Sequence, residues 1–423
     1  MRSYRFIHAA DLHLDSPFRG MVEDAPQFAS TLRDATFDTY EAIIELCIAE
    51  RADALLVAGD IYDGADRSLR AQLRFIEGLR RLDEAGIRAF ICHGNHDPLD
   101  GWEAQLTFPG NVVQFGPSVS AEPVNTSDPG SPLVYGMSYP TREVRENLVP
   151  LFPQPEPGRF CIGLLHANVG ANTGHEPYAP CSLADLEQSG MDYWALGHVH
   201  TRAVLRDRHP TVVYPGNPQG RHVNEAGARG VYVVDVDGQG APRLEFRAVD
   251  RVRWERVSLA IDELENEQDL LDAAERRLLE TRDDAGGRPL VYRLRLDGRG
   301  ALHASLSRNG FLRDVQDQLN DRLANGNAFA FCERIDDETS PDVDREELRA
   351  SQDLLGDIVR MADDLVEDEE ALEELRGELR VLFEHQRARR YLSDRAVDQD
   401  DVRAFLREAE RLLVDELYDA GGR

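Results

Sequence analysis

Nitrogen and oxygen donors of the kind that bind metal ions recur directly after short apolar runs in the first 200 residues. The set contains two carboxylates, one amide and four imidazoles: Asp11, His13, Asp60, Asn95, His166, His198 and His200. Such donors without a thiolate favour Mn²⁺, Fe²⁺ or Zn²⁺ over Mg²⁺ or Ca²⁺. Seven side chains exceed what one open catalytic ion needs, and they fit two ions about 3.5–4 Å apart that share a bridging carboxylate. We predict that Asp60 is that bridge.

The spacing of these residues supports a shared site. Asp11 and His13 are two residues apart, as are His198 and His200. In extended chain, side chains two residues apart point the same way, so each pair can face one metal site. A single histidine at a strand end is more often an ordinary polar residue. The ordered set, with each member after a predicted strand, argues against that reading.

Short apolar runs of strand length position these donors, and helical patterns separate the first of them. The predicted strands are residues 4–8, 54–58, 87–92, 160–165, 193–196, 211–214 and 230–236. The predicted helices are residues 28–49 and a segment that Ser68 caps. Alternating strands and helices indicate an α/β sheet domain, in which ligands bind beyond the carboxyl ends of the strands. Every donor of the set falls there.

The character of the sequence changes twice after this domain. Strand and helix patterns near residues 252–259, 262–281, 290–296 and 328–335 suggest a small α+β unit, and the pattern from residue 340 onward is purely helical. We therefore predict three parts: an α/β sheet domain at 1–250, a small α+β domain at 251–339 and a helical segment at 340–423.

The ordered motifs DLH, GD, GNHD, H and GHVH resemble those of the calcineurin-like metallophosphoesterases, which hydrolyse phosphate esters with a dinuclear metal centre. The resemblance implies an α+β sandwich core. It implies that Asp11, His13, Asp60 and His200 hold one ion, and that Asp60, Asn95, His166 and His198 hold the other. It also implies that His96 is the catalytic histidine and that Asp97 orients it.

A narrower resemblance covers nearly the whole chain. The segments FIHAADLHLDSPF, VAGDIYD, CHGNHDP, LLHANVG, ALGHVH and YPGNPQGRHVNEAGARG are similar to those of bacterial DNA repair exonucleases of the SbcD type, in their YhaO-like branch. This similarity implies that residues 1–250 are a metallophosphoesterase nuclease domain, residues 251–339 a capping domain and residues 340–423 a helical partner-docking segment. It also implies DNA as the substrate, Mn²⁺ as the usual metal, and an SMC-like ATPase that docks on the C-terminal helices. Close relatives often form homodimers.

Three further features are less firmly assigned. Asn217, Gln219, Arg221 and His222 lie in a donor-rich loop that could hold DNA phosphates, although Pro-Gly-Asn-Pro is equally a turn sequence. Asp63 stands where archaeal and eukaryotic relatives carry a histidine. Asp15 and Asp63 receive no role from the sequence.

Charge and composition limit how a substrate is held. Acidic residues number 78 against 48 basic ones, a net charge of −30, and all 48 are arginine. Residues 336–423 hold 28 acidic and 13 arginine residues, which is half of the excess. A general basic footprint for DNA and a polybasic membrane anchor are excluded. The acidic, lysine-free composition suggests salt adaptation, in which metal ions and direct geometry carry more of the DNA binding than surface charge does.

The remaining composition favours a cytoplasmic enzyme. The five scattered cysteines contain no CxxC pair, and no apolar run or signal-peptide pattern indicates a membrane or secreted protein. Two alternatives to the DNA exonuclease or endonuclease subunit stay open. One is a dinuclear-metal phosphoesterase that acts on nucleotides or other small phosphate esters. The other is a non-catalytic DNA-end or ATPase scaffold. Similarly, the apolar stripes of the C-terminal helices could dock a partner or pack only on the capping domain.

Overall fold

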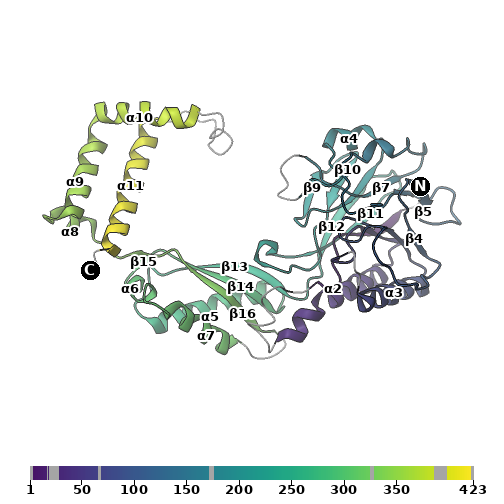
Figure 1. Cartoon of the computed structure of the whole chain (residues 1–423), viewed down its shortest axis with the longest axis horizontal. Helices are drawn as coiled ribbons and strands as arrows, with labels where there is room; N and C mark the ends of the chain where they lie inside the picture. The colour runs from purple at the N-terminus through teal and green to yellow at the C-terminus, as the bar shows by residue number, and fades with distance from the viewer. Residues whose placement is uncertain are drawn as a thin grey trace. The chain divides into compact units, whose positions relative to one another are not determined.

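The strands of the first 250 residues form two six-stranded sheets (Figure 1). The strands of one sheet are β1 (Tyr4–Ala9), β2 (Ala54–Ala58), β3 (Arg88–Cys92), β4 (Val112–Gln114), β11 (Gly230–Val236) and β12 (Pro242–Ala248). The strands of the other are β5 (Ser120–Pro123), β6 (Leu133–Gly136), β7 (Cys161–His166), β8 (Tyr193–Gly197), β9 (Ala203–Arg206) and β10 (Thr211–Tyr214). The first sheet has the order β12-β11-β1-β2-β3-β4 and the second β5-β6-β7-β8-β10-β9.

The computed structural model describes residues 3–16, 18, 28–64, 68–170, 176–323, 328–384 and 398–420. The chain divides into two compact units. The first comprises Met1–Val257, Leu278–Arg293 and Asn320–Arg334, and the second comprises Ser258–Arg277, Leu294–Leu319 and Ile335–Arg423. Both six-stranded sheets belong to the first unit.

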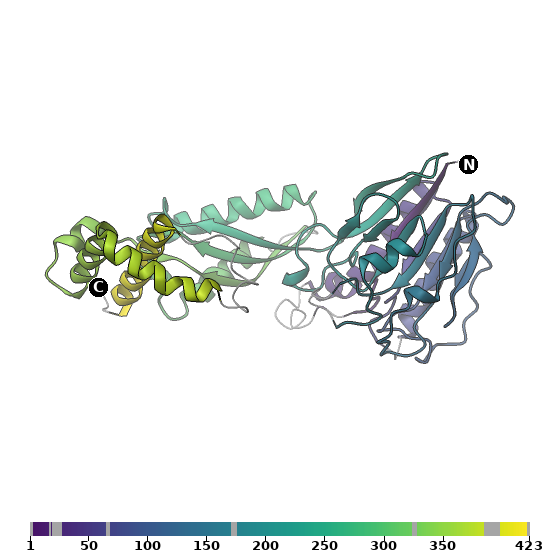
Figure 2. The ribbon, with the colours of Figure 1, turned by 90° about the horizontal axis from the view of Figure 1, so that it is seen from above.

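Alternating side chains of β1 show how the layers of the first unit pack. Tyr4 and Phe6 join an apolar core between the two sheets. Ile7 and Ala9, on the opposite face of the strand, join the core beneath helices α2 (Ala29–Ala49) and α3 (Leu69–Glu84). The outer face of the second sheet packs against α4 (Leu183–Gln188) and the short helix η2 (Val149–Leu151). Figure 2 shows the same layers from above, and the predicted α/β class is confirmed.

The helices of the first unit begin and pack as their sequences direct. The side chain of Ser68 accepts a hydrogen bond of 3.0 Å from the backbone N–H of Ala71, which caps α3 as predicted. Ile43 and Ile44 on α2 are fully buried, and so is Leu79 on α3. Burial of these apolar faces holds both helices against the first sheet.

Parallel pairing decides where the predicted donors lie. β1, β2 and β3 run parallel, and so do β7 and β8. The carboxyl ends of parallel strands meet at one edge of their sheet. The loops that follow β1, β2, β3 and β8, together with the last residue of β7, carry all seven predicted donors.

The rest of the chain contains a smaller sheet and a series of helices. Strands β13 (Arg253–Ala260), β14 (Leu290–Asp297) and β16 (Ala330–Asp337) pair in that order, and β15 (Arg299–Gly300) pairs with β17 (Ser340–Pro341). The helices are α5 (Glu267–Asp284), α6 (His303–Leu306), α7 (Phe311–Leu323), α8 (Arg345–Ala350), α9 (Leu354–Glu367), α10 (Glu369–Glu384) and α11 (Gln399–Ala420). Across the described residues, none of the helices has the length and apolar character needed to cross a membrane.

Candidate metal centre

Tight turns bring the predicted donors of the first sheet into one cluster. The backbone φ values of Asp11, His13 and Asp60 are 52°, 44° and 49°. These values lie in the left-handed region that residues other than glycine rarely adopt. The backbone N–H of His13 donates to the carbonyl of Asp60 over 3.0 Å, which locks the two loops together. Strained backbone held by its surroundings is common at functional sites.

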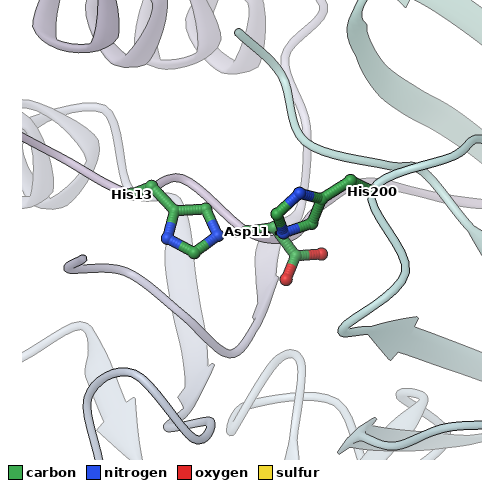
Figure 3. Close-up of side chains that lie close together, drawn as sticks. All are labelled: Asp11, His13 and His200. Carbon is green, nitrogen blue, oxygen red and sulfur yellow. Dashed lines mark hydrogen bonds between the residues drawn. The ribbon is translucent and has the colours of Figure 1, made fainter. Parts of the chain in front are cut away.

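One donor group combines the first loop with the loop after β8. Ligand atoms of Asp11, His13 and His200 lie within 4.8 Å of one another, and Figure 3 shows the three side chains converging. The Nε2 atoms of His13 and His200 are 3.1 Å apart. A second group, Asp11, Asp60 and His166, meets the same criterion and is buried. The structure therefore brings oxygen and nitrogen donors of both sheets together.

Asn95 completes the second donor group. Its Oδ1 atom lies 3.1 Å from Nε2 of His166 and 3.3 Å from Nδ1 of His198. Nε2 of His166 is also 3.4 Å from Oδ2 of Asp60. Four of the predicted donors, Asp60, Asn95, His166 and His198, thus converge on one small volume.

Each of the four histidines uses one ring nitrogen outside this donor cluster. Nδ1 of His166 lies 3.0 Å from the carbonyl of Ala58, and Nε2 of His198 lies 2.8 Å from that of Glu176. Nδ1 of His13 faces Asp63 at 3.1 Å, and Nδ1 of His200 faces Glu225 at 2.7 Å. The other nitrogen of each ring faces the cluster. Histidine ligands of metals show this arrangement, because an outer hydrogen bond fixes the tautomer and the ring orientation. The donor set therefore fits divalent metal ions.

Burial and mutual charge shift the pKa values of these groups. Burial lowers the pKa of His13 to about 3, which favours the neutral imidazole that metals require. Burial alone would raise the pKa of Asp60, but the neighbouring His166 lowers it well below its usual value. Burial raises the pKa of Asp11 to about 6. A buried carboxylate of this kind is stabilised in its charged form by a nearby cation.

Two glycines permit the close approach of these residues. A Cβ atom on Gly94 would lie 2.4 Å from Oδ1 of Asp60 and 2.8 Å from Nε2 of His166. A Cβ atom on Gly197 would lie 1.8 Å from the carbonyl oxygen of Ala58. None of these three distances is possible for a real Cβ atom, so the cluster requires glycine at positions 94 and 197.

His96 lies at the mouth of the cluster, whereas Asp97 lies beneath it. The backbone N–H of His96 donates to Oδ1 of Asp60 over 2.9 Å, and the side chain is 36% exposed. The fully buried Asp97 accepts hydrogen bonds from the N–H groups of Gly94 and Ile61 and lies 3.2 Å from Nδ1 of His93. The carboxylate of Asp63 lies 3.7 Å from Nδ1 of His96. Asp63 is therefore a candidate to orient His96, and the role predicted for Asp97 stays a prediction.

The predicted DNA-binding loop separates into buried and accessible residues. Asn217 and Gln219 are 1% and 2% exposed. Asn217 donates to the carbonyl of Gln219 and accepts from Arg229, and the Gln219 amide bonds to Thr39 and Val252. These internal hydrogen bonds leave both amides enclosed, and their contact with a substrate stays a prediction. Arg221 is largely buried and His222 is 55% exposed, and their contact with DNA stays a prediction.

A hollow of about 190 Å³ opens over the cluster. Its lining residues are Asp60, Asn95, His96, Arg142, Glu176, Tyr178, His198 and His200. Arg142, Glu176 and Tyr178 were not predicted, because they lie in loops without a recognisable motif. Arg142 is the only arginine of the lining, and no ion pair is found for it among the described residues.

Asp15 and Asp63 both have defined contacts. Asp15 accepts a hydrogen bond of 2.6 Å from Ser68, at the cap of α3, and lies 3.6 Å from Arg70. Asp63 contacts Ser16 and Arg221 besides His13. Burial would raise the pKa of Asp63, but the close contact with the His13 imidazole lowers it well below the ordinary value. Asp15 thus stabilises the start of α3. Asp63 contacts the candidate metal ligand His13 through the ring nitrogen that faces away from the donor cluster.

Comparisons with known proteins identify similar sequences and matching family models. A family model described as calcineurin-like phosphoesterase matches residues 4–202, and one described as the middle domain of metallophosphoesterase YhaO matches residues 254–340. The chain is 37% identical over 336 residues to the uncharacterized metallophosphoesterase YhaO of Bacillus subtilis, covering 79% of this chain and 81% of that protein. It is 24% identical over 327 residues to the DNA double-strand break repair protein Mre11 of Sulfurisphaera tokodaii, covering 75% and 78%. For the Mre11 protein of Aeropyrum pernix the identity is 29% over 279 residues, covering 61% and 64%.

Proposed function

Because this chain belongs to the calcineurin-like metallophosphoesterases, we propose that it hydrolyses phosphodiester bonds in DNA with a dinuclear centre, for which Mn²⁺ is the physiological metal. The single observation that carries the metal site is the shared arrangement of His13, His166, His198 and His200. Each has one ring nitrogen on a carbonyl or carboxylate and turns the other toward shared oxygen donors.

The donor groups suggest how two ions would be held. Asp11, His13, Asp60 and His200 would hold one ion. Asp60, Asn95, His166 and His198 would hold the other. Asp60 is the proposed bridge because its carboxylate lies 3.4 Å from His166 and 4.0 Å from His13. Such a centre, when occupied, supplies an activated water and neutralises charge on the phosphate.

His96 is the proposed proton donor to the leaving oxygen. The hydrogen bond from its backbone N–H to Asp60 fixes the residue beside the donor cluster. Its Nδ1 atom lies 3.4 Å from the carbonyl of Asp63, so Nε2 is the nitrogen left for a substrate oxygen. Proton transfer from a positioned histidine contributes about 10²–10⁴-fold to a rate.

Arg142 is the proposed contact for a substrate phosphate. It lines the hollow beside His96 and is exposed. In a protein of net charge −30, a cation at this place favours a polyanionic substrate at the site itself. DNA is the proposed substrate because two of the similar proteins are named as DNA double-strand break repair proteins.

We further propose that the C-terminal helices bind an SMC-like ATPase. In the second unit, Leu375, Leu379, Val402, Phe405 and Leu406 line an apolar groove of about 380 Å³ between α10 and α11. Phe405 is 45% exposed in that groove. Phe405→Glu should abolish co-purification of the ATPase from the same organism. Trp102→Glu, which changes another exposed aromatic residue, should leave it intact, and equal recovery with both variants would contradict docking at this groove.

Substrate choice tests the main proposal. The purified protein is incubated with end-labelled duplex DNA, single-stranded DNA, mononucleotides and p-nitrophenyl phosphodiesters, each with Mn²⁺ or with EDTA. The proposal expects Mn²⁺-dependent loss of a DNA substrate. Hydrolysis of the small esters alone would contradict it and favour a nucleotide or small-ester phosphoesterase.

A further inference from the structure

Two candidate metal ligands share a supporting carboxylate network on the side away from the donor cluster. Nδ1 of His13 lies 3.1 Å from Oδ1 of Asp63, and Nδ1 of His200 lies 2.7 Å from Oε1 of Glu225. His13 is 1% exposed and Glu225 is 3% exposed. A carboxylate therefore lies against the Nδ1 atom of each imidazole, and each carboxylate needs a partner of its own because an unpaired buried charge is costly.

Arg221 is a partner of both carboxylates. Its Nη1 atom donates to Oδ1 of Asp63 over 3.1 Å. Its backbone N–H donates to Oε2 of Glu225 over 2.8 Å, and its Nη2 atom lies 3.6 Å from Oε1 of the same residue. The same Nη1 atom also donates to the hydroxyl of Ser16 over 2.9 Å, and Ser16 in turn donates to Asp63.

These contacts form a closed ring of side chains. Starting from His13, the ring passes through Asp63, Arg221, Glu225 and His200. It returns to His13 through the 3.1 Å approach of the two Nε2 atoms. All five residues belong to the first unit. A planar guanidinium suits the position of Arg221, because Nη1 hydrogen-bonds to Asp63 while Nη2 lies within ion-pair distance of Glu225.

We infer that Arg221 is a positioning residue that sets the orientation of the His13 and His200 imidazoles for one metal ion by holding the carboxylates of Asp63 and Glu225. The inference rests on the proposed metal centre but not on DNA as the substrate. It gives Arg221 a role inside the protein, where its guanidinium is engaged and only 13% exposed.

Metal binding by the intact protein tests this role. Arg221→Gln should weaken Co²⁺ or Mn²⁺ binding about 10–100-fold in calorimetric titrations, which is the usual cost of losing support behind a metal ligand. At saturating Co²⁺, the visible absorption spectrum of Arg221→Gln should differ from that of the wild type, because the ligand directions change. Arg221→Lys keeps the positive charge but not the several donors of the guanidinium. Its metal affinity should lie between those of the wild type and Arg221→Gln.

Arg253→Gln is the matched control. Arg253 is 8% exposed and forms two hydrogen bonds of 2.8 Å with Asp250, so the change removes a similarly buried pair elsewhere in the same unit. It should lower the melting temperature of the metal-free protein without altering the Co²⁺ spectrum. If Arg221→Gln does not fold, Glu225→Gln serves as the second variant. It removes the charge behind His200 and should weaken metal binding in the same way.

Two results would overturn the inference. One is wild-type metal affinity and an unchanged Co²⁺ spectrum in Arg221→Gln. The other is an equal loss of affinity in Arg253→Gln. Wild-type protein that binds metal but cleaves no DNA would contradict the proposed function alone, whereas wild-type protein that binds no divalent metal would overturn both.

Discussion

The Nε2 atoms of His13 and His200 lie 3.1 Å apart although 187 residues separate them in the chain. His13 follows β1 of the first sheet and His200 follows β8 of the second. Their approach therefore depends on the apolar core between the two sheets, to which Phe6 and Tyr193 contribute with ring centroids 5.2 Å apart. Packing of the two sheets against each other therefore also brings together the two halves of the candidate metal centre.

Loss of the bridging carboxylate should remove both ions. In Asp60→Asn the charge shared by the two donor groups is gone, so metal content measured by mass spectrometry should fall from two ions toward none. Asp192→Asn is the control, because Asp192 is a half-buried carboxylate that accepts from the backbone N–H of Cys161. Two bound ions in purified Asp60→Asn would refute the bridge.

A methyl group at position 94 should disrupt the candidate metal centre although every proposed ligand residue is unchanged. The added Cβ of Gly94→Ala would meet Asp60 and His166, so metal affinity should fall at least about tenfold, as expected when ligand geometry is displaced. Gly116→Ala places its Cβ in open space and should bind metal as the wild type does. Equal affinities of the two variants in calorimetric titration would show that the cluster is not closely packed.

The proximity of the seven donors could be predicted from the sequence, because each follows a buried strand and parallel strands bring their carboxyl ends to one edge. Glu225 and the role of Asp63 could not be predicted, because their importance arises from contacts with His200 and His13 across separate loops. The burial of Asn217 and Gln219 could not be predicted for a related reason. A polar loop looks solvent-exposed in sequence, and only the fold reveals the buried carbonyl of Val252 and the Arg229 side chain that these amides bond.

Burial explains part of the accuracy of the element predictions, although the fully buried strand β6 was also missed. β2 (Ala54–Ala58) and β10 (Thr211–Tyr214) match their predicted bounds because they are continuous apolar runs enclosed on both faces. The three-residue strand β4 and the largely exposed strand β5 were not predicted, because neither carries an apolar run or a clear alternation.

Arg142 should affect substrate capture more than metal binding. Arg142→Ala should lower kcat/KM on DNA about 10–100-fold, the range expected for losing a charge-assisted phosphate contact, with unchanged metal content. Arg145→Ala is the matched control, because Arg145 lies three residues away, is 78% exposed and pairs with Glu143. Similar DNA cleavage kinetics for the two variants would remove Arg142 from the substrate site.

His8 should make the stability of the metal-free protein depend on pH. Burial lowers the pKa of His8 to about 3 from an ordinary value of 6.5, and its ring lies 3.0 Å from the Tyr193 hydroxyl. Between these pH values the unfolded chain binds a proton that the folded chain does not, so stability falls as pH falls below 6.5. The contribution is about 1.4 kcal/mol per pH unit, or about 2 kcal/mol between pH 6.5 and pH 5.

Urea unfolding of wild type and His8→Gln at several pH values, in EDTA, measures this contribution. The variant cannot titrate at this position, so its free energy of unfolding should fall by about 2 kcal/mol less than that of the wild type over the same range. Parallel pH profiles for the two proteins would contradict a buried neutral His8.

The most direct test of the account measures bound metal and DNA cleavage together in His96→Ala. His96 lies beside the donor cluster and belongs to neither donor group assigned to the ions, although its ring lies within 4.8 Å of ligand atoms of His13 and Asp63. The account predicts that the variant keeps the wild-type content of two Mn²⁺ ions per chain and cleaves end-labelled DNA about 10²–10⁴-fold more slowly. Cleavage at the wild-type rate, or loss of the metal together with the activity, would contradict the assignment of a metal centre and a separate proton donor.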